Sequence, residues 1–129
     1  MGAKKRKCSH EETAMVDVTG GRKNDSGKLR YDLDSVPATR ERVAVLTHGA
    51  QKYGDRNWEQ GIKYSRIYAA LQRHLTAFWD GEDMDQESGL SHLAHASCEL
   101  MFLQHFAVER DNGNYIELDD RPVINEEVE

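Results

Sequence analysis

The chain has 129 residues, of which 38% are hydrophobic and 31% charged, a composition that predicts one folded domain with a single core. A net charge of −6 disfavours nucleic-acid binding, and no apolar run approaches the roughly 20 residues that a membrane span needs. With two cysteines and no secretory signal, the chain is expected to be cytoplasmic and reduced. Six histidines, four of them between residues 74 and 105, are the feature that needs an explanation.

The apolar pattern divides the chain into three regions. Residues 1–27 are charged and lack an apolar period, which predicts a flexible arm. Residues 28–110 have helical periodicity and are expected to form the folded domain, and residues 111–129 form a turn with an acidic tail. No stretch is rich in strand residues, so the predicted fold class is all-α, a compact helical bundle.

Capping residues and apolar spacing place three helices in this domain. The first covers about 37–53 and ends at Gly54. The second begins at Ser65 as its N-cap and ends before Gly81, and the third begins at Ser88 and ends near residue 110. The acidic link between the last two is short, which predicts an antiparallel hairpin at the centre of the bundle.

Each of these two helices has an expected buried stripe. The second helix has apolar residues at helical spacing, namely Ile67, Leu71, Leu75 and Phe78. In the third helix the stripe consists of Leu93, Ala96, Leu100, Leu103 and Ala107.

Three histidines are expected to meet between these helices. His92 and His95 share one face of the third helix, and a hairpin that turns around Asp85 places His74 opposite them. Buried imidazoles need partners and repel one another when protonated, so a shared divalent cation such as Mn, Mg, Co, Ni or Zn is one solution. The alternative is that these histidines only fill the helix interface.

Carboxylates lie near this predicted cluster. Glu99 follows the histidines on the same helical face, and Glu82 and Asp85 lie at the hairpin end. Either group can complete the ligand set of a cation bound by mixed nitrogen and oxygen donors.

Two features predict contacts with a nucleotide. Arg66 and Arg73 are seven residues apart on one helical face, where guanidinium groups suit phosphate oxygens, although they can also be surface charges paired with acids. The loop after the first helix contains base-binding candidates, whose aromatic rings can stack on a base and whose amide can bond its edge: Tyr53, Asn57 and Trp58, next to Lys52. The alternative for Trp58 is a plug at the end of the bundle.

Several other site types are absent from the sequence. It contains no HExxH, GxxxxGK[ST] or CxxC motif and no His-Asp dipeptide, and no serine or cysteine nucleophile has a supporting pattern.

Three blocks of sequence resemble a known family. KLRYDLDSVP, HGAQKYGDRNWEQG and RHLTAFWDGEDMDQESGLSHLAH are similar to the phage dATP/dGTP diphosphohydrolases, compact relatives of the MazG-like all-α NTP pyrophosphohydrolases that include the MazZ proteins. The resemblance covers roughly residues 28–105. It implies hydrolysis of a purine dNTP, dGTP first and dATP second, to dNMP and pyrophosphate in 2-aminoadenine genome synthesis of a phage, hence in the host cytoplasm. It also implies a homo-oligomer, dimer or tetramer.

One departure from the MazG pattern affects the expected metal site. That pattern has a Glu-rich EExxE helix followed by ExxD, whereas this chain has Arg73-His74 and then His92-x-x-His95. Either the site is rebuilt with nitrogen ligands, which favours a transition metal, or its carboxylates are Glu82, Asp85, Glu87 and Glu99.

The expected roles follow from this resemblance and the helical geometry. The metal ligands are His92 and His95, then His74 and Asp85, with Glu82 or Glu99 as a further ligand or the general base. The expected phosphate-binding residues are Arg66, Arg73, Lys28 and Lys52. The alternatives are a non-catalytic nucleotide- or metal-binding regulatory bundle and a helical interaction module.

Overall fold

The computed structural model describes residues 15–16 and 18–123, which fall into two compact units divided between Asp34 and Ser35. The N-terminal unit contains two short antiparallel strands, β1 (Met15–Val16) and β2 (Arg22–Lys23), and the 3-10 turn η1 (Tyr31–Leu33). Most of the predicted flexible arm, residues 1–14 and 17, lies outside the described residues, as does the end of the acidic tail, 124–129.

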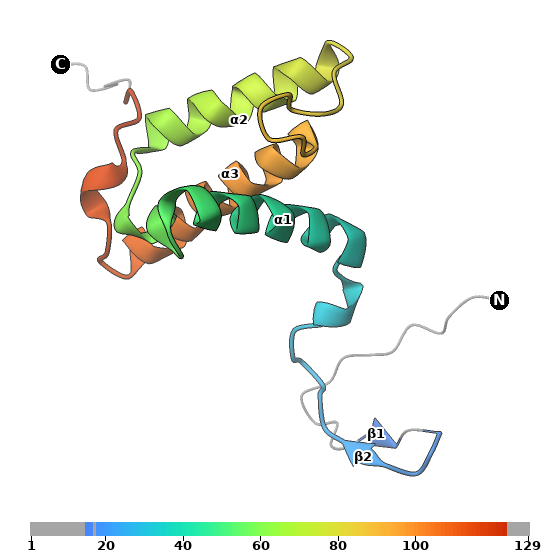
Figure 1. Cartoon of the computed structure of the whole chain (residues 1–129). Coiled ribbons are helices and arrows are strands. Elements are labelled where there is room, and N and C mark those ends of the chain that lie inside the picture. The colour runs from blue at the N-terminus through green and yellow to red at the C-terminus, as the bar shows by residue number, and fades with distance from the viewer. Residues whose placement is uncertain (1–14, 17, 124–129) are drawn as a thin grey trace. The chain divides into compact units, whose positions relative to one another are not determined.

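The second unit is helical (Figure 1). Its elements are α1 (Val36–Tyr53), the 3-10 turn η2 (Asn57–Gln60), α2 (Tyr64–Trp79), α3 (His92–Asp111) and the 3-10 turn η3 (Ile116–Leu118). Because α3 packs against both α1 and α2, it is the central element of this unit. The prediction of a mostly helical fold is therefore confirmed, and no helix among the described residues has the length and apolarity to cross a membrane.

The starts of the helices show which capping predictions hold. The Ser35 side chain accepts a hydrogen bond from the Ala38 amide at 3.1 Å and so caps α1, as the sequence predicts. Ser65 is not an N-cap, because α2 begins one residue earlier and the Asp120 carboxylate binds the Ser65 amide instead. Ser88 is also not a cap, since Ser91 caps α3.

The predicted apolar stripe of α3 is partly wrong. Leu93 and Leu100 are 44% and 53% exposed, whereas Ala94 and Cys98 are buried. The reason is that α3 lies between two helices and buries small side chains toward α1, so a single stripe does not describe it. Toward the other end of the helix, Phe106 is fully buried in the core.

The core consists of two clusters along α3. One contains Tyr64, Ile67, Phe106 and Leu118, and the other contains Val45, Ala94 and Cys98. Phe102 packs against both clusters and joins them. Since Leu118 belongs to the first cluster, the helical unit extends beyond the predicted boundary at residue 110.

Candidate functional site

The hairpin between α2 and α3 brings the predicted histidines together. The chain reverses through backbone pairing of Met84 with Ser91 and a 2.7 Å hydrogen bond from the Asp85 amide to the Leu90 carbonyl. This turn joins the C-terminal end of α2 to the start of α3. It therefore sets the register in which His74 faces the first turn of α3, as the sequence predicts.

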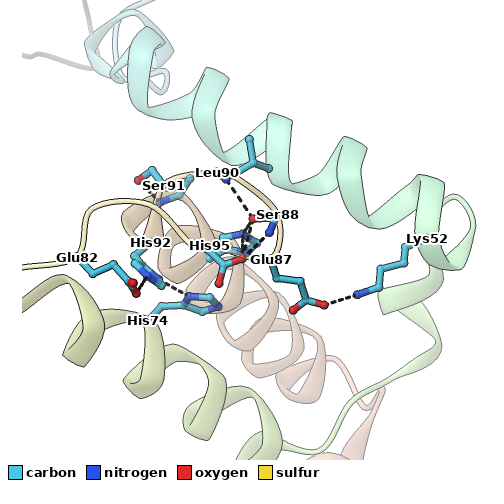
Figure 2. Close-up of polar contacts among 11 residues, drawn as sticks. Lys52, His74, Glu82, Glu87, Ser88, Leu90, Ser91, His92 and His95 are labelled. Carbon is cyan, nitrogen blue, oxygen red and sulfur yellow. Dashed lines mark hydrogen bonds and ion pairs between the residues drawn. The ribbon is translucent and has the colours of Figure 1, made fainter.

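Three imidazoles form a compact cluster at this junction (Figure 2). The Nδ1 atoms of His74 and His92 are 2.9 Å apart, and the ring of His95 is stacked on that of His74 with a centroid separation of 4.6 Å. His92 is buried, and the other two are half-buried. Two facing Nδ1 atoms at this distance share either a proton or a cation.

Glu82 orients the buried histidine. Its carboxylate binds Nε2 of His92 at 2.8 Å, which leaves Nδ1 of the ring pointing to His74. A carboxylate on the outer nitrogen is the usual arrangement for a metal-binding histidine, because it fixes the tautomer and raises the basicity of the other nitrogen. Glu82 is therefore a hydrogen-bond partner of a possible metal ligand, on the opposite side of the His92 ring from the nitrogen that faces His74.

Among the described residues, His74, Asp85 and His92 form a group whose ligand atoms all lie within 4.8 Å of one another. Two nitrogen ligands at 2.0–2.1 Å from a tetrahedral ion are about 3.3 Å apart, so the 2.9 Å separation has to open by only a few tenths of an ångström. Two imidazoles and one carboxylate suit a transition metal such as Mn, Co or Zn better than Mg, which prefers oxygen ligands.

His95, expected to be a principal ligand, is outside this three-residue group. Its Nε2 lies 2.7 Å from the Ser88 hydroxyl and 3.9 Å from the Asp85 carboxylate. The Ser88 amide and hydroxyl also bond the Asp85 carboxylate, at 2.8 and 2.9 Å. Ser88 thus joins Asp85 to His95 in one network beside the cation position.

The electrostatic environment of His74 and Asp85 favours the protonation states that bind cations. Burial lowers the pKa of His74, and the neighbouring His95 and His92 lower it further. Burial also lowers the pKa of His95, against the raising effect of Asp85. For Asp85, burial acts to raise the pKa, but hydrogen bonds from Ser88 outweigh it and hold the pKa below its ordinary value. Neutral imidazoles and an ionised carboxylate are the protonation states that bind cations.

A cavity of about 820 Å³ adjoins this cluster. It is lined by the second half of α1, the η2 turn, the hairpin and one face of α3. His74 and Asp85 form part of its wall, so a cation held by them faces the cavity. Ligand sites are typically 300–1,000 Å³, which makes this space large enough for a nucleotide.

Two ionisable residues of α3, Glu99 and Cys98, line the cavity and differ in their protonation near neutral pH. Burial raises the pKa of Glu99 to about 7, although Arg73 opposes the effect, so its carboxyl can gain or lose a proton near neutral pH. Burial raises the pKa of the Cys98 thiol to about 12, so it stays protonated and offers no thiolate nucleophile.

The cavity wall contains all three candidate base-binding residues but only one of the four candidate phosphate-binding residues. Tyr53, Asn57 and Trp58 all line the cavity, as does Lys52, which forms a 3.5 Å ion pair with Glu87. The Trp58 ring stacks on Phe102 at a centroid distance of 4.7 Å and also packs in the core, in line with the alternative role predicted for it.

The remaining phosphate candidates lie elsewhere. Arg66 and Arg73 are exposed on α2 and do not line the cavity, although the charge of Arg73 acts on both His74 and Glu99. Lys28 lies in the N-terminal unit, outside the unit that forms the cavity.

Sequence reasoning missed two residues at the site. His48, which is not among the expected site residues, lines the cavity from α1 and lowers the pKa of His95. Ser88, expected as a cap, binds Asp85 and His95. The spacing Asp-x-x-Ser-Gly is typical of a turn closed by an aspartate side chain and was the available signal for Ser88. The available signal for His48 was its position as the first residue of the block HGAQKYGDRNWEQG.

Comparisons with known proteins agree with the resemblance in sequence. Residues 18–120 match the family model described as dATP/dGTP diphosphohydrolase, N-terminal. Over 83 residues the chain is 43% identical to a dATP/dGTP diphosphohydrolase of Salmonella phage PMBT28. That stretch is 64% of this chain but 28% of the relative, so the chain spans less than a third of the relative's length. No solved structure matches the chain. With most of its length covered by the family model, this chain belongs to the dATP/dGTP diphosphohydrolase family.

Proposed function

We propose that this chain binds a purine dNTP in the cavity and, with a divalent cation, hydrolyses it to dNMP and pyrophosphate, dGTP being the preferred substrate. The observation that carries the proposal is the position of His74, Asp85 and His92, which form a possible cation site at the wall of a nucleotide-sized cavity. The name of the phage relative supports the same substrate class. Release of dGMP would supply the synthesis of a 2-aminoadenine nucleotide in an infected host.

The chain's own residues have separable tasks in this proposal. His74, Asp85 and His92 hold the cation, and Glu82 fixes the orientation of the buried ring. A divalent cation there supplies neutralisation of phosphate charge and a lowered pKa for the attacking water. Glu99, whose pKa is about 7, is poised to accept the proton of that water.

Other residues of the cavity wall suit the base and the phosphates. Asn57 offers a donor and an acceptor to a base edge, and Tyr53 offers a ring face. Lys52 exchanges its ion pair with the exposed Glu87 for a phosphate oxygen. Phosphoryl transfer depends mainly on positioning and charge neutralisation, which a small helical unit can provide.

A second candidate is cation-dependent nucleotide binding without cleavage. The observation that favours it is that the aligned region is 28% of the phage relative and matches a model named for an N-terminal part. In that case the cavity and the cation site are retained, but no dNMP forms.

One experiment distinguishes these functions. The protein is incubated with each dNTP and with Mn²⁺, Mg²⁺, Co²⁺ or Zn²⁺, and the products are resolved by ion-exchange chromatography. Pyrophosphate and dNMP support hydrolysis, whereas nucleotide binding by calorimetry without products supports the second candidate. Free phosphate with dNDP would show cleavage at a different bond.

Matched variants test the assignment of the site. We expect the double variant of His74→Ala and His92→Ala to lose at least 100-fold in kcat/KM, since it removes both nitrogen ligands. Gln104→Ala is the control, because it changes an exposed residue of α3 that does not line the cavity. Full turnover by the double variant contradicts the proposed cation site.

A further inference from the structure

Two turns that are far apart in sequence share an unusual backbone conformation. Arg56, at the start of η2, has φ of 57°, and Tyr115, at the start of η3, has φ of 55°. They are the only non-glycine residues with positive φ in the described part of the chain. This conformation is unfavourable for a bulky side chain such as tyrosine and persists only where surrounding contacts fix it.

The contacts that fix Tyr115 attach η3 to η2. Its hydroxyl donates a hydrogen bond to the Glu59 carbonyl at 2.6 Å, and its ring packs edge-on against Phe106 at 4.8 Å. Next to η2, Gly61 approaches Leu118 so closely that a Cβ on the glycine would lie 3.3 Å from the leucine side chain. The two turns therefore pack as one unit at the end of the bundle.

The η2 turn also forms a wall of the cavity. Arg56, Asn57 and Trp58 line it, whereas Glu59 points its carbonyl away to the Tyr115 hydroxyl. Tyr115 does not line the cavity. Any effect of its hydroxyl on a bound nucleotide must therefore pass through the η2 backbone.

We propose that Tyr115 is a positioning residue that holds the η2 turn in the conformation in which Asn57 contacts the base of the nucleotide and Trp58 forms part of the cavity wall. This inference rests on the proposed function for the identity of the ligand. The hydroxyl acts on recognition of the base. The proposed cation group of His74, Asp85 and His92 contains no residue of η2 or η3, so we expect binding of the cation and the phosphates not to depend on this hydroxyl.

The first test measures the solvent accessibility and the amide exchange of the η2 turn in the absence of any ligand. The chain has two tryptophans, so in a Trp79→Phe background Trp58 is the only tryptophan and reports on η2 when tryptophan is excited selectively over the five tyrosines. Tyr115→Phe removes only the hydroxyl. We expect acrylamide quenching of Trp58 to rise about twofold and amide exchange of residues 57–61 to become about tenfold faster. Tyr68→Phe, at a half-exposed tyrosine of α2, is the matched control. Unchanged quenching and exchange in the Tyr115 variant overturn the proposal.

The second test links the turn to the base. With dGTP and Mn²⁺, Tyr115→Phe is expected to raise KM, or Kd if no turnover occurs, by about three- to tenfold with kcat within twofold. Its affinity for tripolyphosphate, which has no base, stays unchanged. Equal loss of affinity for both ligands overturns the proposal and leaves the proposed function intact. A wild-type protein that binds no dNTP refutes the proposed function itself, and with it the role in base recognition.

Discussion

Replacing Glu99 by glutamine should stabilise the folded protein at high pH. Burial raises the pKa of this carboxyl from 4.5 to about 7, against the lowering effect of Arg73. The folded protein therefore keeps the Glu99 proton to a higher pH than the unfolded chain does, and stability falls as the pH rises from about 4.5 through 7. One pKa unit corresponds to about 1.36 kcal/mol, so a fully buried group would cost about 3 kcal/mol at pH 8. Because Glu99 is partly exposed, solvent screening reduces this to about 1–2 kcal/mol.

The assay is urea unfolding of wild type and Glu99→Gln at pH 5 and pH 8, with EDTA present. We expect the variant to exceed the wild type by about 1–2 kcal/mol at pH 8 and by much less at pH 5. His74 and His95, whose pKa values are lowered, destabilise both proteins as the pH falls, so the difference between the proteins largely removes their contribution. Glu117→Gln, at an exposed position, is the control. A difference that is the same at both pH values refutes the assigned environment of Glu99.

Three further outcomes follow from the structure. Mn²⁺ or Zn²⁺ should raise the melting temperature of the wild type, by an amount that grows with cation concentration, but not that of His92→Ala, as differential scanning fluorimetry can measure. Asp120→Ala should cost about 1 kcal/mol in urea unfolding, because its carboxylate binds the Ser65 amide and hydroxyl at the start of α2, and an equally stable variant contradicts this role. Trp79 is 86% exposed on α2, and an exposed tryptophan is a candidate for the interface of the homo-oligomer that the family resemblance implies. Trp79→Ser should therefore lower the molar mass measured by light scattering. An unchanged molar mass excludes this face as the interface.

The convergence of the histidines was predictable, but the details of their bonding were not. Helical spacing and the short link were enough to bring His74 opposite the start of α3, because local geometry fixes both. The choice between His95 and Asp85 as the third member of the group depends on the conformation of the hairpin. That conformation comes from the hydrogen bonds of Ser88, which pattern reasoning assigned to a helix cap.

The parts of the fold that escaped prediction depend on tertiary packing. Leu100 fits an ideal apolar stripe but is exposed, because α3 buries small residues such as Cys98 toward α1. Leu118 follows the last helix in a polar stretch, and nothing local indicates that it enters the core beside Phe106. Periodicity predicts the buried face of a single helix, whereas the burial of these residues depends on packing against more than one neighbouring element.

The central helix α3 carries its candidate site residues at one end and its largest fully buried side chain near the other. Its first turns carry His92, His95 and Glu99, and its later turns carry Phe106, which is fully buried in the larger core cluster. A combinatorial library at positions 92, 95 and 99 alone would therefore exchange candidate ligand types while the buried Ala94, Cys98 and Phe106 keep the fold. If the proposed cation site is correct, substitutions at these few positions would change cation preference without rebuilding the scaffold that presents them.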